Sequence, residues 1–137
     1  MATATAPIQR AYAVGDLNSH NMKASTKIYQ GSAVGVASGT SVARPLVATD
    51  KFVGFATDTF DNSTGVDAAK TVLVKSEGMV VLTVVGLAAT TPVGTSVYAS
   101  DDATFTLTST SNSLIGKIHR VESGAVKAVV SFNADLI

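Results

Sequence analysis

From residue 27 to the C-terminus, short runs rich in Val, Thr, Ile, Phe and Tyr alternate with clusters of Gly, Ser, Asn and Asp. Residues of the first kind suit the pleated surface of a strand, and residues of the second kind favour turns. In residues 104–108 a period of two places Phe105 and Leu107 on one face and three threonines on the other, which is typical of a strand with one buried face. The same reasoning predicts strands over residues 27–30, 33–37, 52–59, 71–75, 79–85, 96–99, 104–108, 114–121 and 126–132.

Many short strands separated by turns indicate an all-β domain. We predict a small β-barrel, or a β-tulip or sandwich, built from short antiparallel strands. Only residues 66–70 could form a helical turn. Residues 79–85 are apolar on both faces, which predicts a central strand that is fully buried.

A pattern of apolar residues around a glycine occurs twice in the β region. A glycine inside a strand marks a bulge or the close approach of another backbone. Two such glycines in matching places predict a pseudo-symmetric barrel with two similar corners. Each copy consists of an apolar-Tyr pair, an apolar-apolar-Gly segment and a Val-rich strand. In the first copy these are Ile28-Tyr29, Phe52-Val53-Gly54 and residues 71–74. In the second copy they are Val97-Tyr98, Leu114-Ile115-Gly116 and residues 128–130.

Residues 1–26 are small, polar and without a period. Segments of this composition at a chain end bury little apolar surface on their own. We therefore divide the chain into an extended N-terminal arm, residues 1–26, and a β domain, residues 27–137. The arm carries four spaced apolar side chains that are suited to contact with a neighbouring molecule: Ile8, Tyr12, Val14 and Leu17.

Composition narrows the possible functions. The 137 residues include no cysteine, which excludes disulfides and thiolate metal sites, and ten basic side chains balance ten acidic ones. Because the basic residues are scattered singly, we expect no binding to nucleic acid or to an acidic membrane surface. No secretory signal and no membrane-spanning run are predicted.

No group of side chains predicts an enzyme, a metal site or a bound cofactor. His20 and His119 are expected to face solvent, and no serine lies in a Gly-x-Ser-x-Gly turn. Asp101-Asp102 is better explained as a turn than as a catalytic pair. Several residues of one loop carry side-chain oxygens, but their spacing is not that of an EF-hand calcium loop. We therefore expect these residues to form acidic turns rather than to bind calcium. These residues are Asp58, Asp61, Asn62 and Asp67.

Four segments of the second half carry motifs in a fixed order. A Pro-x-Gly-x-x-Val-Tyr segment is followed by a short turn with a Leu-Thr strand, an apolar-Ile-Gly strand and a closing Val-rich strand, at residues 91–99, 101–108, 113–118 and 126–132. Val-Gly-Val-Ala-like segments lie at residues 32–37 and 52–56. In these motifs the chain resembles the capsid decoration (cement) family of tailed bacteriophages, and the resemblance covers residues 27–132.

The resemblance implies a protein made in the host cytoplasm that binds the outer surface of an expanded head in the virion. It implies contact with the major capsid protein and assembly as a homotrimer, and a mechanical role without catalysis. A carbohydrate- or receptor-binding β module of a phage fibre or tail is the alternative. Such modules use exposed aromatic rings, and this chain has no Trp and only eight Phe and Tyr residues. A minor tail or baseplate component has nearly the same expected sequence.

Overall fold

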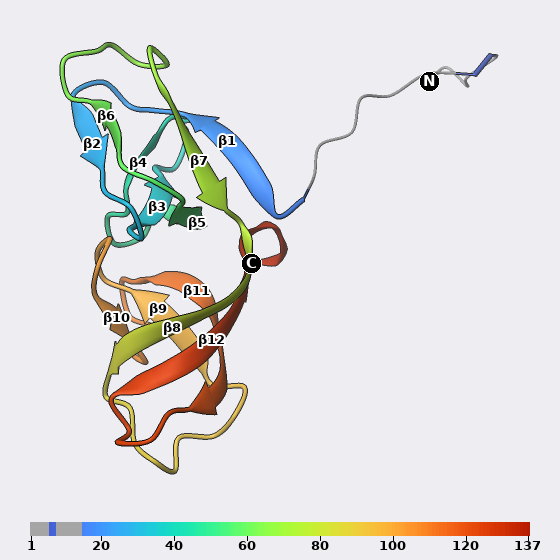
Figure 1. The fold of residues 1–137 in the computed structure, drawn as a ribbon, viewed down its shortest axis with the longest axis vertical. Coiled ribbons are helices and arrows are strands. Elements are labelled where there is room, and N and C mark those ends of the chain that lie inside the picture. The colour runs from blue at the N-terminus through green and yellow to red at the C-terminus, as the bar shows by residue number, and fades with distance from the viewer. Residues whose placement is uncertain (1–5, 8–14) are drawn as a thin grey trace.

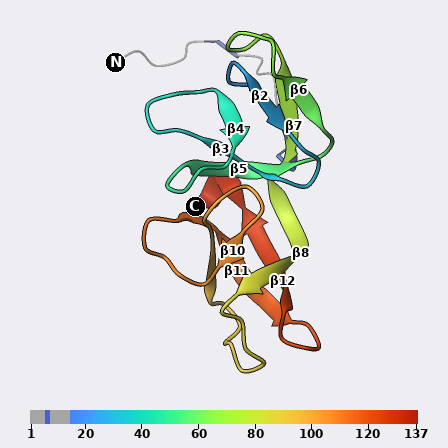
Figure 2. The ribbon, with the colours of Figure 1, turned by 90° about the vertical axis from the view of Figure 1, so that its left-hand side faces the viewer.

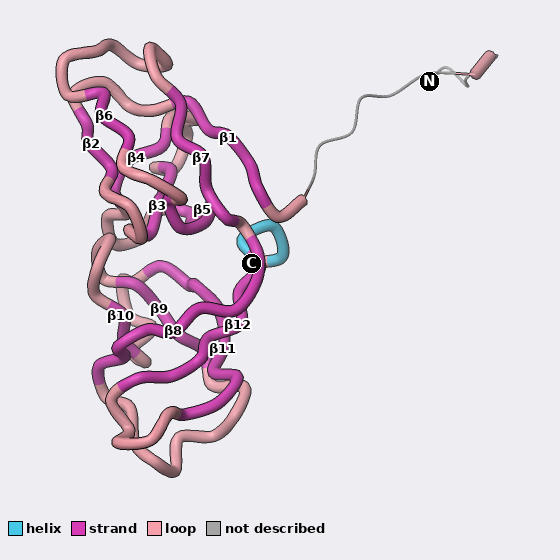
Figure 3. The backbone as a smooth tube through the Cα atoms, viewed as in Figure 1, coloured by secondary structure: helices cyan, strands magenta, loops and turns pink. Residues whose placement is uncertain are grey.

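The computed structural model describes residues 6–7 and 15–137, and this part of the chain is all-β, as predicted (Figure 1). In these residues a single 3-10 turn, η1, follows the last strand near the C-terminus (Figure 3). The strands are β1 (Leu17–Asn21), β2 (Thr26–Ile28), β3 (Ala33–Val36), β4 (Ala43–Pro45), β5 (Lys51–Ala56), β6 (Phe60–Asn62), β7 (Thr71–Lys75), β8 (Glu77–Val85), β9 (Ser96–Ala99), β10 (Phe105–Thr106), β11 (Ser113–Val121) and β12 (Lys127–Asn133), and η1 is Ala134–Leu136.

The strands form two lobes, one above the other, joined by the chain between β7 and β8 (Figures 1 and 2). Lobe 1 (residues 15–76) contains a five-stranded sheet in the order β1-β7-β5-β3-β4 and a small sheet of β2 and β6. Lobe 2 (residues 77–137) is a closed barrel in the order β10-β8-β12-β11-β9. The predicted barrel therefore accounts for the second half of the chain.

The two lobes have the same topology. Read from β8, the barrel order is β8-β12-β11-β9-β10, which matches β1-β7-β5-β3-β4 strand for strand in chain order. The matching neighbours are antiparallel in both lobes. Even the parallel closure of the barrel by β8 and β10 has a counterpart, because Met22 and Ala43 form a parallel bridge after β1. Strands β2 and β6 are additions to lobe 1.

Individual hydrogen bonds repeat as well. The Gly31 amide donates to the Ala56 carbonyl at 2.9 Å, and at the matching corner of lobe 2 the Gly94 amide donates to the Ile118 carbonyl at 2.9 Å. Both glycines have a positive φ, +83° and +93°, which is a conformation that glycine adopts at no steric cost. The chain thus contains the same β unit twice, in tandem.

Gly54 and Gly116 confirm the predicted corners. Each stands at a register shift, in the pairing of β5 with β3 and of β11 with β9. A Cβ on Gly54 would lie 2.5 Å from the Lys75 carbonyl oxygen, and one on Gly116 would lie 2.2 Å from the Ser131 carbonyl oxygen. The backbones approach too closely for a side chain. The first segment of the predicted repeat was misaligned, because Val97 occupies the place of Val34 rather than of Ile28.

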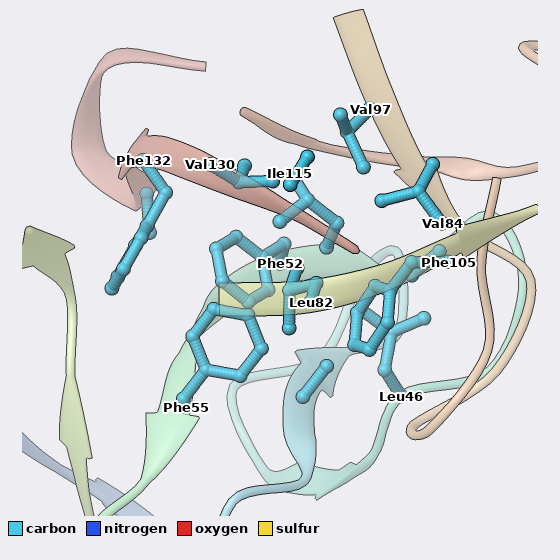
Figure 4. Packing of buried hydrophobic residues seen from close by; sticks show 14 of the residues in the cluster. Leu46, Phe52, Phe55, Leu82, Val84, Val97, Phe105, Ile115, Val130 and Phe132 are labelled. Carbon is cyan, nitrogen blue, oxygen red and sulfur yellow. The ribbon is translucent and has the colours of Figure 1, made fainter. Parts of the chain in front are cut away.

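The main core spans both lobes. Lobe 1 contributes Leu46, Phe52 and Phe55 to a cluster whose other members are mostly interior residues of the barrel (Figure 4). The rings of Phe52 and Phe55 lie 6.1 and 5.0 Å from the ring of Phe132, edge to face. A smaller cluster fills lobe 1 alone and includes Met22 and Ile28. Packing of aromatic rings from β5 into the barrel therefore holds the lobes together.

The predicted arm, residues 1–26, extends too far. Leu17–Asn21 form β1, which pairs with β7, and β2 begins at Thr26. Met22 between them is fully buried. The polar sequence of β1 hid this strand, because its stability comes from pairing with β7 rather than from apolar side chains. The β domain therefore begins before residue 27, at β1.

Two further predictions about single segments were wrong. Residues 66–70 form turns rather than a helical turn. Strand β8 is not buried on both faces, since Met79, Val81 and Val85 are each more than half exposed. The short strands β4 and β6 were missed because three residues carry too little periodicity to be recognised.

Candidate interaction surfaces

Three of the four predicted arm anchors, Ile8, Tyr12 and Val14, lie outside the described residues. The fourth, Leu17, is the first residue of β1 and pairs with Lys75. Its side chain is 44% exposed. Leu17 is thus a partly exposed residue of the sheet, at the edge where the N-terminal segment joins lobe 1.

This junction is fixed by Ser76, which is buried between the lobes. The Ser76 amide donates to the Asp16 carbonyl at 2.9 Å, and its hydroxyl donates to the Gly15 carbonyl at 2.7 Å. The Asn18 side-chain amide donates to the same hydroxyl at 2.9 Å. The Ser76 carbonyl accepts from the Ala134 amide at 2.8 Å. Both ends of residues 15–137 are therefore held at the joint between the lobes, next to the start of β8.

The C-terminal turn is held from the other side by Lys51 of β5. Its Nζ atom donates to the Ile137 carbonyl at 2.6 Å and to the Ala134 carbonyl. Burial lowers the pKa of Lys51, and the nearby Asp135 carboxylate opposes this shift. The ammonium group thus ties lobe 1 to the last residues of lobe 2.

His20 of β1 is half-buried rather than solvated as predicted, whereas His119 is exposed. Burial lowers the pKa of His20, and the Asp135 carboxylate partly opposes this shift. Among the described residues no acidic side chain is hydrogen-bonded to His20. The histidine therefore has no partner there that would orient it as a catalytic base.

The oxygen-bearing residues at 58–67 serve separate turns. The Asp61 carboxylate accepts from the Ser63 amide at 2.9 Å, and hydrogen bonding to the Ser63 side chain and to this amide lowers the pKa of Asp61. The Asp67 carboxylate accepts from the Ala24 amide at 2.7 Å. The side-chain amide of the buried Asn62 donates to two backbone carbonyls at 3.0 Å. Within residues 6–7 and 15–137, no group of three or more His, Asp or Glu side chains is placed to hold a metal ion.

Two hollows on the surface of residues 15–137 carry no convergent reactive groups. One lies between β11, β12 and the C-terminal turn, and has a volume of about 370 Å³ lined by Gly116, Phe132, Asn133 and Leu136 among others. A second lies over the turn at Asn62. Catalytic sites bring a nucleophile or base together with a partner that orients it, and neither hollow does so.

The clearest unusual surface is the outer face of β8. Met79, Val81 and Val85 alternate along the strand and are exposed by 59%, 55% and 58%. The duplicated lobe shows what this fold needs at the same places. The pair Leu17–Lys75 of lobe 1 corresponds to the pair Met79–Ser131 of lobe 2. Ser19 therefore occupies the place of Val81, and Lys23 occupies the place of Val85. Lobe 1 folds with polar side chains at these two places, whereas Met79 matches the apolar Leu17. The two exposed valines of β8 are therefore not a requirement of the fold.

Sequence reasoning missed this surface because it assigned the whole apolar run to the core. An apolar run can also combine one buried face with one face kept for a partner. The sequence reveals the exposed apolar face of β8 only when the two halves of the chain are correctly aligned. With that alignment, Val81 and Val85 of β8 stand where lobe 1 has Ser19 and Lys23, whereas both strands alternate in burial along their length.

Within the part of the chain that the structure describes, no helix is long and apolar enough to cross a membrane. A scan against protein-family models and a search of curated proteins find no match to this sequence.

Proposed function

We propose that this protein is a head decoration (cement) protein that binds the outer surface of an expanded phage capsid and stabilises contacts between major capsid subunits. The observation that carries the proposal is the fixed junction at Ser76. It joins the N-terminal segment, with Ile8, Tyr12 and Val14, to a rigid body made of two packed β lobes. The sequence resemblance described above supplies the identity of the target.

The mechanism would be mechanical. An N-terminal segment bound to one capsid subunit and a body resting on another would link the two subunits through Ser76 and the shared core. Because copies occupy many equivalent positions on a lattice, modest individual contacts add up to a large effect. A neutral, weakly charged surface suits such packing, since few charges lose their hydration on binding.

Co-sedimentation with undecorated, expanded heads tests this proposal. We expect binding to saturate at a fixed number of copies per major capsid subunit and to raise the temperature at which the heads rupture. Unexpanded heads of the same phage are the control and should bind less. A folded protein that does not sediment with matched heads would contradict the proposal.

Deleting residues 2–14 should weaken head binding by roughly tenfold or more, in the same assay, because many weak contacts on a lattice act together. This deletion ends before Gly15, so β1 and the contacts of Ser76 are retained and the body should keep its melting temperature. A variant in which a Gly/Ser segment of equal length replaces residues 2–14 separates the loss of Ile8, Tyr12 and Val14 from the loss of length. Unchanged affinity of both variants would rule out a role of the N-terminal segment in binding.

A carbohydrate- or receptor-binding module has less support. Stacking sites need exposed aromatic rings. Four of the five phenylalanines are buried, and in the described residues Tyr29 is the one aromatic residue that is more than half exposed. Lys27 already lies over its ring, 5.1 Å from the centroid. The alternative stays a prediction that a glycan screen of the folded protein would test.

A further inference from the structure

The outer face of β8 forms an apolar strip, defined by Met79, Val81 and Val85 and interrupted only by Thr83. Isolated exposed valines are common on protein surfaces, but a row of large apolar side chains along one strand marks an interface.

The strip is preformed and rigid. Seven residue pairs join β8 to β12, and β10 closes the barrel at the other edge of β8. Two of the strip residues are β-branched valines, which lose little side-chain freedom on binding. A surface that is already ordered binds with a smaller entropic cost.

The charges around the strip favour a second copy of this chain as the partner. Glu77 lies at the start of β8, and Lys127 lies beside Thr83 near its end, and both side chains are exposed. If the β8 strands of two copies ran antiparallel to each other, Glu77 of each copy would therefore lie near Lys127 of the other copy. The chain as a whole has no net charge, so two copies do not repel each other at long range. The strip is also apolar at three of its four outward positions, and homodimer interfaces are more apolar than the interfaces of transient complexes.

We propose that two copies of this protein pack against each other through the strip on β8, with their β8 strands antiparallel. This pairing would leave the N-terminal junction at Ser76 free for a different contact. It does not depend on the proposed binding to phage heads, and it is separate from the trimer that the sequence resemblance implies.

Light scattering of the full-length protein across micromolar concentrations tests the pairing. We expect the wild-type particle to have twice the mass of the M79T/V81T/V85T variant. Threonine keeps the strand preference and, at Val81 and Val85, the shape of valine, so the variant should fold, which circular dichroism and melting would verify. The control V66T/V93T changes two valines that are more exposed, at 73% each, and lie outside β8. The control should keep the wild-type mass, and equal masses of the wild type and the triple variant would overturn the proposal.

The absence of cysteine allows a second test by crosslinking. A V81C variant treated with a short bismaleimide should give a covalent pair in high yield. The matched control S19C carries its cysteine at the equivalent place on β1 and should give little. Equal yields from V81C and S19C would overturn the pairing through β8. Neither measurement uses phage heads, so a failure here would leave the decoration proposal untouched.

Discussion

Replacing Gly116 by alanine should destabilise the protein by about 3 kcal/mol or more, at the upper end of what overpacking costs. The new Cβ would lie 2.2 Å from the Ser131 carbonyl oxygen and 3.1 Å from the Phe132 Cβ atom. The first of these atoms belongs to the backbone of β12, so the clash can be relieved only by separating β11 from β12 at the barrel wall. Urea unfolding followed by circular dichroism would measure the loss.

Alanine variants at two other glycines provide reference values for this loss of stability. Gly54 is the counterpart of Gly116 in lobe 1, and its alanine variant should lose a similar amount, because a Cβ would lie 2.5 Å from the Lys75 carbonyl oxygen. A Cβ on Gly15 would have no atom within 4 Å, and the alanine variant at this position should keep wild-type stability. A Gly116 variant as stable as the Gly15 variant would refute the assignment of a close backbone contact.

The glycine pattern explains how much of the fold could be predicted. Gly54 and Gly116 follow apolar pairs inside strong strand patterns, so their role was readable from local sequence. Strand β1 was not readable, since Leu17-Asn18-Ser19-His20-Asn21 has the composition of a loop. Its place in the sheet depends on β7, which lies far along the chain at residues 71–75. Local patterns do not carry information about such distant pairing.

The candidate surfaces show a similar limit. Alternation along β8 indicates two faces but does not say which face meets the core when both are apolar. The comparison of the two lobes decides this, because Val81 and Ser19 occupy equivalent places. One segment of the sequence repeat was misaligned, so this equivalence depended on knowing the strand order.

The two units also differ at the surface where one lobe could cover the other. Lobe 1 covers the barrel with Leu46, Phe52 and Phe55. The positions in lobe 2 that match Leu46 and Phe55 are Thr108 and Lys117, which are exposed and polar. The position that matches Phe52 is Leu114, which is half-buried. Lobe 2 therefore lacks, at two of the three positions, the apolar side chains with which lobe 1 covers the barrel.

Replacing Phe52 by alanine should cost about 4 kcal/mol, within the range for a large buried aromatic residue. Phe52 is fully buried, and its ring lies 5.2 Å from that of Phe55 in lobe 1 and 6.1 Å from that of Phe132 in lobe 2 (Figure 4). The cavity would open at the contact between the lobes, where Phe52 supports both. Urea unfolding would measure the loss.

The same variant tests whether the lobes fold as one unit. Because the main core is shared, hydrogen exchange should show β5 and β12 losing protection together in Phe52→Ala, by a similar factor. The matched control is Phe60→Ala in β6, a half-buried ring that packs against the lobe 1 cluster, and it should lower protection mainly in lobe 1. If β12 kept its wild-type protection in Phe52→Ala, the barrel would be stable by itself, and the aromatic contact would join two independent domains rather than complete a single core.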